Sequence, residues 1–189
     1  MDVVITDVPA HVIAERQRLG LDIRDEVRDG DYHMVPSPLD EHQRMSGELY
    51  VLLHPLAKRA HLEIRFEQNL IPPDEPGWRD FRVPDLLVFP AAVRQPRGAV
   101  GAASLVVEIR SPGDESYEKL PFFERLGVGE VLIIERDTKA IRRWVLDGTV
   151  LVEAAADDAG RHPLRCLPVS LWTAGGRLVV DADGTVTTI

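Results

Sequence analysis

The sequence predicts a mixed α/β fold, and three features of the 189-residue chain indicate it. An apolar stripe at helical spacing runs through residues 39–60. Two short apolar runs, at 86–89 and 105–107, are bounded by Pro, Gly and Ser, which favours buried strands over helices. A third such run, at 131–134, follows a further predicted helix. Strands that precede and follow a helix are typical of a mixed sheet covered by helices.

The N-terminal residues predict a short helix and a β-hairpin. Residues 9–19 have an amphipathic pattern, and residues 21–27 alternate between apolar and charged side chains. Asp29 and Gly30 form a dipeptide that is typical of a tight hairpin turn, and a second strand is expected at 32–35. We therefore expect a helix followed by two paired strands.

The long helix at residues 39–60 is expected to have a polar cap and an irregularity near its end. Ser37 or Asp40 is suited to cap its first turn. Pro55 lacks a backbone donor, so we expect either a kink there or a break into two shorter helices. The core-facing stripe consists of Met45, Leu49, Leu52, Leu53 and Leu56. Residues 61–70 then alternate as a strand.

The second half of the chain predicts one helix and then strands. The helix is expected at residues 114–126, ended by Gly127. Asp147 and Gly148 predict another hairpin turn. The remaining strands are expected at residues 140–145, 149–152, 164–171, 177–180 and 185–189. Because no repeat or long linker divides the sequence, we expect a single domain over residues 1–189.

Composition limits the classes of protein to which the chain can belong. Hydrophobic residues make up 44% and charged residues 28%, as in ordinary globular proteins. No apolar run approaches the roughly 18–20 residues that a membrane span needs, and the N-terminus lacks the basic segment of a secretory signal. The single cysteine, Cys166, excludes an internal disulfide and a cysteine-rich zinc site. We therefore expect a cytoplasmic protein that makes no membrane contact.

The net charge of −9 counts against tight, sequence-independent binding to nucleic acid, because phosphate neutralisation needs a basic surface. A local basic face stays open, since several arginines surround the two acidic strands. These are Arg79, Arg82, Arg94, Arg97 and Arg110. The sequence contains no GxxxxGK loop, no GxGxxG and no HExxH motif, so we expect no nucleotide cofactor and no zincin chemistry.

Two carboxylates mark the ends of the two apolar runs: Asp85 precedes one and Glu108 follows the other. Carboxylates at buried strand ends are costly unless cations or donors meet them, and two neighbouring ones repel each other unless a cation lies between. Lys119 follows on the next predicted helix. The pattern indicates a Mg²⁺ or Mn²⁺ site with a charged helper. The alternative interpretation is that both acids form surface ion pairs and that an exposed Lys119 pairs with Glu115.

Further residues are candidates for a supporting role. Arg110 shares a strand face with Glu108, where it could bind phosphate or form a structural ion pair. Glu48 on the long helix could turn toward the sheet as a further acid, although a solvated glutamate is the simpler interpretation. Glu67 on the strand at 61–70 has the same two interpretations as Glu48. His42 and His33 are candidates for a catalytic base, but the pattern shows no partner for either, and polar surface histidines are the simpler interpretation.

Longer stretches carry a resemblance to known proteins. They are RDEVRDGDYHMVPSPLDEHQRMSGELYVLL, VPDLLVF, LVVEIRSPGDESYEKLPFFERLGVGEVLIIE and IRRWVL. Over about residues 23–146 the chain resembles the Uma-type restriction endonucleases of the PD-(D/E)XK nuclease superfamily. The resemblance implies a restriction endonuclease-like core with a mixed central β-sheet flanked by helices. The N-terminal hairpin and the β-rich residues 147–189 are then additions to this core.

The resemblance also implies metal-dependent hydrolysis of phosphodiester bonds. Asp85 and Glu108 match the metal-binding acids of these nucleases, and Lys119 resembles their catalytic lysine, moved from the strand to the following helix. Three residues depart from the pattern, and one of them is Phe123, which stands where relatives often have tyrosine. Arg110 occupies the strand position of that lysine, and Pro121 falls inside the expected helix unless the helix starts near residues 116–119.

The resemblance gives accessory positions to Glu115, where many relatives have an aspartate, and to Glu48, which resembles a helix acid of the superfamily. The first functional hypothesis is a Mg²⁺-dependent endonuclease that acts on DNA. The second is a catalytically weak or inactive nuclease-fold module that binds a partner or a second copy of itself. A homodimer would supply the two active sites that double-strand cleavage needs.

Overall fold

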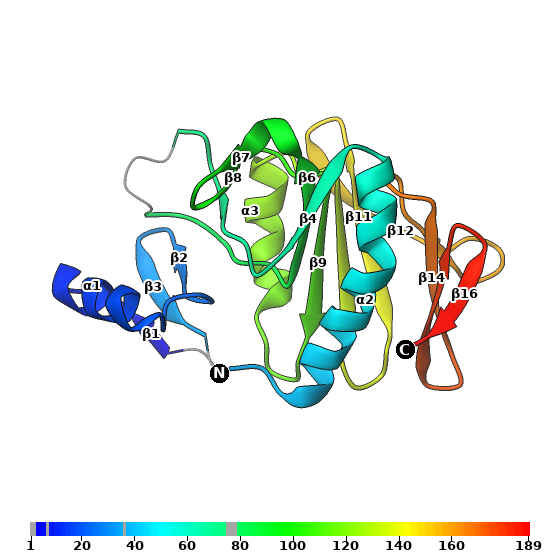
Figure 1. Cartoon of the computed structure of the whole chain (residues 1–189), viewed down its shortest axis with the longest axis horizontal. Helices are drawn as coiled ribbons and strands as arrows, with labels where there is room; N and C mark the ends of the chain where they lie inside the picture. The colour runs from blue at the N-terminus through cyan, green and yellow to red at the C-terminus, as the bar shows by residue number, and fades with distance from the viewer. Residues whose placement is uncertain (1–2, 7, 36, 75–78) are drawn as a thin grey trace.

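The computed structural model describes residues 3–6, 8–35, 37–74 and 79–189, and a six-stranded sheet forms its centre (Figure 1). The strands are β4 (Leu62–Phe66), β6 (Leu86–Pro90), β9 (Leu105–Arg110), β10 (Glu130–Glu135), β11 (Ile141–Asp147) and β12 (Val150–Ala154). Their spatial order is β12-β11-β10-β9-β6-β4. Strands β9 and β10 are parallel, and the other neighbouring pairs are antiparallel. The mixed sheet predicted from the sequence is confirmed.

One helix covers each face of this central sheet. Helix α2 (Asp40–Arg59) packs on one face, and α3 (Leu120–Arg125) packs on the other. Because successive side chains of a strand point to opposite faces, Val107 of β9 belongs to the core beneath α2 and Val106 to the core beneath α3. Phe123 of α3 is completely buried in the second core. The apolar stripe and the apolar strand runs therefore account for both cores.

Within the described residues, three smaller sheets surround the central one. The N-terminal sheet, in the order β1-β3-β2, contains β1 (Val3–Ile5), β2 (Glu26–Arg28) and β3 (Asp31–Met34). The second, in the order β5-β8-β7, contains β5 (Leu70–Ile71), β7 (Arg94–Gln95) and β8 (Gly98–Val100). The C-terminal sheet contains β13 (His162–Pro163), β14 (Val169–Ala174), β15 (Arg177–Ala182) and β16 (Thr185–Thr188) in sequence order. Helix α1 (Ala10–Leu19) lies beside the N-terminal sheet, and the short 3-10 helix η1 spans Ala91–Val93.

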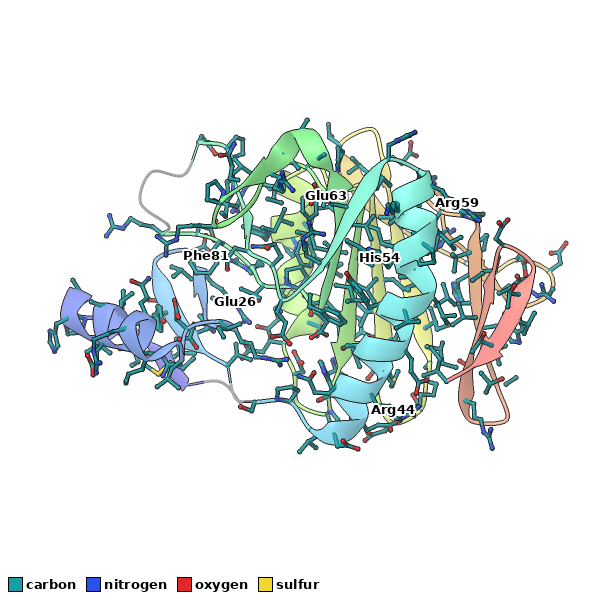
Figure 2. The ribbon with its side chains drawn as sticks, in the orientation of Figure 1. Glu26, Arg44, His54, Arg59, Glu63 and Phe81 are labelled. Carbon is teal, nitrogen blue, oxygen red and sulfur yellow. The ribbon has the colours of Figure 1, made fainter. Side chains whose placement is uncertain are left out.

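The two additional β-regions contact the core in different ways. The C-terminal sheet contributes Leu171 and Val180 to the core beneath α2. The N-terminal sheet meets the loop before β6, where Val27 bridges to Phe81 and where Glu26 faces the core (Figure 2). The hairpin turn predicted at Asp29-Gly30 joins β2 to β3, and both residues have positive φ.

Helix α2 differs from its prediction at both ends. Its N-cap is Leu39, which makes no side-chain capping bond, so the expected cap by Ser37 or Asp40 is wrong. Asp40 is instead the first helical residue, where its charge favours the positive end of the helix dipole. The helix continues through Pro55 to its last residue, so the alternative of two separate helices is also wrong.

The helix predicted at residues 114–126 is shorter than expected. A 3-10 helix, η2 (Ser116–Lys119), comes first, and α3 begins only at Leu120. The reason is Pro121, which lacks a backbone donor and fits an α-helix without cost only in the first turn.

Three predicted strands are also shorter. Residues 21–27 contribute to a strand only from Glu26 onward, because a turn bonds the Asp25 N–H to the Asp22 carbonyl. Residues 61–70 are divided into β4 and β5, with Glu67 between them in a left-handed conformation. The strand expected at 164–171 begins only at residue 169. Among the described residues, no helix combines the length and the apolar character that crossing a bilayer requires.

Two glycines test the packing of this fold. A Cβ atom on Gly98 would lie 2.5 Å from the backbone oxygen of Asn69, whereas a Cβ atom on Gly47 in α2 would meet no atom within 4 Å. We expect Gly98→Ala to lower the free energy of unfolding by about 1–3 kcal/mol. Gly47→Ala should raise it by about 0.5–1 kcal/mol, because alanine is the better helix former. Urea denaturation measures both, and a shift of the same sign in the two variants would contradict this packing.

Candidate active site

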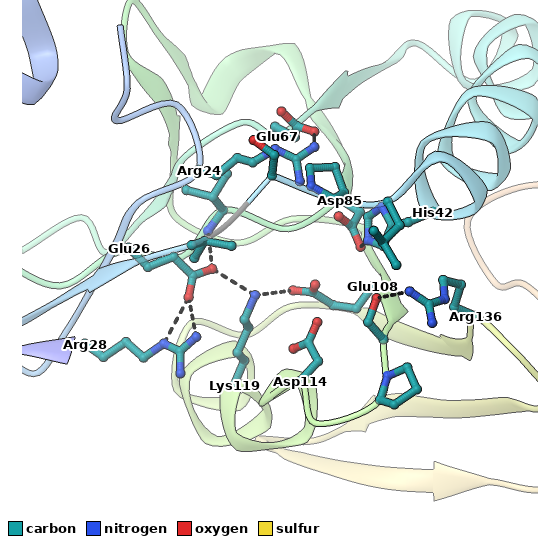
Figure 3. A pocket seen from close by; sticks show the side chains of 17 residues that line it. Arg24, Glu26, Arg28, His42, Glu67, Asp85, Glu108, Asp114, Lys119 and Arg136 are labelled. Carbon is teal, nitrogen blue, oxygen red and sulfur yellow. Dashed lines mark hydrogen bonds and ion pairs between the residues drawn. The ribbon is translucent and has the colours of Figure 1, made fainter. Parts of the chain in front are cut away.

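The two predicted acids and the predicted lysine line one cavity of about 330 Å³ (Figure 3). Asp85 directly precedes β6, Glu108 lies within β9, and Lys119 is the last residue of η2. Strands β6 and β9 are antiparallel neighbours in which Leu86 is opposite Val107. This register places Asp85 beside Glu108, as the two apolar runs of the sequence suggested.

Lys119 is buried between two carboxylates. Its Nζ atom lies 3.1 Å from Oε1 of Glu108 and 2.8 Å from Oε1 of Glu26, and the lysine is 7% exposed. The interpretation of Lys119 as an exposed partner of Glu115 is therefore wrong. The 3-10 turn before α3 directs the side chain toward β9 and the N-terminal sheet (Figure 3).

Glu26 is the main residue of this cavity that the sequence did not reveal. It is completely buried, and its Oε1 atom also accepts a hydrogen bond of 2.9 Å from the backbone N–H of Val83. Its Oε2 atom pairs with Arg28 at 2.9 Å. A glutamate in a charged β-strand looks like an ordinary surface residue, and only its partners, far away in the sequence, identify it as buried.

Burial and neighbouring charges shift the pKa values of Glu108, Glu26 and Lys119 in different directions. Burial is the largest influence on Glu108 and, with the negative charges of Asp85 and Glu26, it raises the pKa of Glu108 well above its ordinary value in spite of Lys119. Burial acts in the same direction on Glu26, but Lys119 and Arg28 outweigh it and lower the pKa of Glu26. Burial by itself lowers the pKa of Lys119, yet the two glutamates hold that pKa above its ordinary value. The cluster therefore keeps Lys119 protonated and Glu26 ionised, whereas burial disfavours the charged form of Glu108.

Asp85 is held by contacts from two elements. Its Oδ2 atom accepts a hydrogen bond of 2.6 Å from the backbone N–H of Ile109, and it lies 3.2 Å from Nε2 of His42. His42 is a buried residue of α2, and its Nδ1 atom has no hydrogen-bond partner among the described residues. The sequence pattern showed no partner for His42, because Asp85 reaches it only through the packing of α2 on the sheet.

Two arginines flank the acids. Arg24 forms an ion pair with Glu67, and Figure 3 shows both on one side of Asp85. Arg136, directly after β10, lies on the side of Glu108, where its Nη1 atom donates to Oγ of Ser111 at 3.3 Å. Both guanidinium groups line the same cavity as the carboxylates. The site therefore presents cations on both sides of an acidic centre.

The three proposed accessory residues do not line this cavity. Glu48 points along the exposed side of α2 and binds Arg44 at 2.9 Å. The guanidinium of Arg110 lies 3.0 Å from Glu135, and Glu115 pairs with an arginine of β2. Arg110 shares a strand face with Glu108. Its ion pair with Glu135 favours a structural role over phosphate binding.

The donor set suits a small hard cation with few protein ligands. In the described part of the chain, no three His, Cys, Asp or Glu side chains gather as a ready-made metal cage. Mg²⁺ does not need one, since it binds through one or two carboxylates and keeps several water molecules. Asp85 and Glu108 provide two carboxylates at one cavity.

Comparison with solved structures identifies the class of fold. The chain is similar to the crystal structure of "a putative nuclease belonging to DUF820" from Anabaena variabilis ATCC 29413, with a TM-score of 0.61. The similarity covers 76% of this chain and 83% of that chain at 17% sequence identity, so it establishes the fold. No curated protein matches the chain significantly in sequence.

The model of the Uma2 family, described as "Putative restriction endonuclease", matches residues 14–178. The chain therefore belongs to the Uma2 family. This match confirms the family resemblance that the sequence suggested, and it extends that resemblance in both directions beyond residues 23–146.

The buried lysine cluster predicts a strong dependence of stability on Glu26. We expect Glu26→Gln to lower the free energy of unfolding by about 3 kcal/mol, because it removes one partner from buried ion pairs. Chemical denaturation measures the change. Glu118→Gln, at an exposed position of η2, is the matched control and should change stability by less than about 0.5 kcal/mol. Equal stabilities of Glu26→Gln and the wild type would show that the pairs do not hold the N-terminal sheet.

Proposed function

We propose that the protein is a Mg²⁺- or Mn²⁺-dependent endonuclease that hydrolyses phosphodiester bonds of DNA at the cavity of Asp85, Glu108 and Lys119. The observation that carries the proposal is the meeting of two carboxylates and a buried lysine in one cavity between β6, β9 and η2. Membership of a family described as restriction endonucleases supports the reaction class.

In this proposal Asp85 and Glu108 hold the metal. A bound divalent cation supplies a more acidic water and neutralises negative charge on the phosphate. His42 and the backbone of Ile109 both contact Oδ2 of Asp85, and they fix the direction of that carboxylate. Lys119 contributes a permanent positive charge at the wall of the cavity, because its carboxylate neighbours keep it protonated.

The role proposed for Lys119 is electrostatic. Negative charge grows on the phosphate oxygens during hydrolysis, and an ammonium group that is already fixed in place stabilises that charge without reorganising. Burial strengthens the effect, because water screens the charge less inside a cavity than at the surface. The ion pair with Glu26 holds the amine in this position.

The second candidate function, a nuclease-fold module without cleavage, is favoured by one specific contact. Glu26 neutralises part of the charge of Lys119, and a lysine that serves a structural ion pair has no need to act on a phosphate. The two functions differ in metal binding, because a purely structural cluster has no reason to take up a divalent cation.

Metal binding is the first test. Calorimetric titration with Mg²⁺ or Mn²⁺ should show binding by the wild type, and Asp85→Asn and Glu108→Gln should each weaken it by about tenfold or more, since each removes a charged ligand. Glu48→Gln is the control, because Glu48 is an acid of α2 that lies outside the cavity. A folded wild type that binds neither metal at millimolar concentration would favour the non-catalytic module.

Cleavage is the second test. We expect Lys119→Met to lower the rate of DNA hydrolysis by roughly 10²-fold while metal binding persists, since loss of one preorganised electrostatic group typically has an effect of this size. A gel assay with a labelled DNA substrate and Mn²⁺ measures the rate, and thermal unfolding of the variant verifies that it is folded. An unchanged rate in folded Lys119→Met would remove Lys119 from the proposed mechanism.

A further inference from the structure

The N-terminal sheet forms a wall of the cavity opposite the core. Glu26 and Arg28 of β2 line the cavity, and so do Ser37 and Leu39 from the segment that leads into α2. Figure 3 shows Glu26 facing Glu108 across the amine of Lys119. The acids therefore do not lie on an open surface: they lie between the inner strands β6 and β9 of the central sheet and this wall.

Several contacts fix the wall to the core. Glu26 is bound by Lys119 and by the backbone of Val83. The next residue, Val27, accepts hydrogen bonds through its carbonyl from the backbone N–H of Phe81 at 2.9 Å and from Nη1 of the buried Arg82 at 2.7 Å. Moving the wall away would expose or separate these buried charges, which is costly. The position of this wall is thus fixed by the fold.

The two arginines on either side of the acids are suited to bind phosphate. The side chains of Arg24 and Arg136 are 18% and 13% exposed, so both are partly withdrawn from water but still reach the cavity. Arg24 pairs with Glu67, and Arg136 pairs through Nε with Asp137 at 2.7 Å and donates through Nη1 to Ser111. Each guanidinium carries five N–H donors, so these contacts leave further donors for another anion. Figure 3 shows them on opposite sides of Asp85 and Glu108.

Glu67, which forms the ion pair with Arg24, has an unusual backbone conformation. Glu67 has a φ of +44°, a left-handed conformation that a side chain rarely adopts, and its N–H bonds to the carbonyl of Asp85 at 3.2 Å. Backbone strain of this kind clusters at functional sites. Glu67 connects Asp85 directly with Arg24, because its backbone N–H binds the Asp85 carbonyl and its carboxylate binds the Arg24 guanidinium.

We propose that this site takes a single nucleic-acid strand, in which the phosphates on the two sides of the scissile phosphate are bound by Arg24 and Arg136. The inference rests on the proposed nuclease function and names its substrate class. A flexible strand can enter a cavity of about 330 Å³ and follow a short track of cations. A duplex is stiff and needs a broad basic surface outside the cavity, which a chain of net charge −9 is poorly suited to provide.

A single-strand substrate also changes what the site requires. One active site is sufficient to cut one strand, so the homodimer expected for double-strand cleavage is not needed. In this proposal Arg24 and Arg136 bind phosphates, and phosphate contacts do not distinguish one base from another. We therefore expect little sequence preference.

The experiment compares binding of two forms of the same DNA. A fluorescently labelled strand of about 15 nucleotides, alone or annealed to its complement, is titrated with the full-length protein. Ca²⁺ replaces Mg²⁺, so that an oxygen-binding cation is present during the anisotropy measurement. The strand should bind roughly tenfold tighter than the duplex or better. Equal or tighter binding of the duplex, or no binding of either form, would overturn the inference.

Two variants test the arginines. Arg24→Gln and Arg136→Gln should each weaken strand binding and lower the slope of log K against log salt by about 0.7, the loss expected for one phosphate contact with a single strand. Arg44→Gln is the matched control, because Arg44 is a partly exposed arginine of α2 that lies outside the cavity. Unchanged slopes in both folded variants would contradict the assignment. Arg24→Lys should keep most of the dependence of log K on log salt concentration, because lysine retains the positive charge.

The inference and the proposed function fail in different ways. If metal binds and duplex DNA is cut faster than the single strand, the nuclease proposal stands and the single-strand inference falls. If the strand binds through Arg24 and Arg136 but no metal binds to Asp85 and Glu108, the binding site stands without the hydrolysis. The comparison of strand with duplex uses the wild type, so it does not depend on how well any variant folds.

Discussion

The ion pairs of Lys119 connect the parts of this structure on which the candidate site depends. A buried lysine is tolerated when carboxylates surround it, and here they come from two regions: Glu108 from the central sheet and Glu26 from the N-terminal sheet. The same amine therefore stabilises the contact between the added sheet and the core, and provides a fixed positive charge in the cavity. A substitution at Glu26 acts on both properties at once.

The geometry of the acids follows from one strand register. Because Leu86 is paired with Val107, Asp85 and Glu108 meet at neighbouring positions of β6 and β9. The backbone N–H of Ile109, next to Glu108, then binds Asp85 directly. Neighbouring carboxylates repel each other, and Lys119 offsets the charge of Glu108 but forms no ion pair with Asp85 among the described contacts. The proposed metal would lie between the two carboxylates and offset the charge of both.

Much of the fold was accessible from the sequence, because it depends on local patterns. The apolar stripe around Leu49 and the apolar strand runs predict α2 and the central strands, and dipeptides such as Asp29-Gly30 predict the turns. The errors lie where one residue overrides a pattern. Pro121 delays the start of α3, and the left-handed backbone of Glu67 separates β4 from β5. Such effects depend on the exact backbone conformation, which periodicity does not report.

The sequence by itself determined which acids and which lysine belong together, since Asp85, Glu108 and Lys119 stand at recognisable positions around two strands and carry a family resemblance. The tertiary structure decided how they are surrounded. Glu26, His42 and the flanking arginines reach the cavity from distant segments, and ordinary strand or helix positions give no sign of this. The physical reason is that burial and charge pairing are properties of contacts between elements. A linear pattern can identify the candidate groups, but the packing sets their charge balance and the residues that surround them.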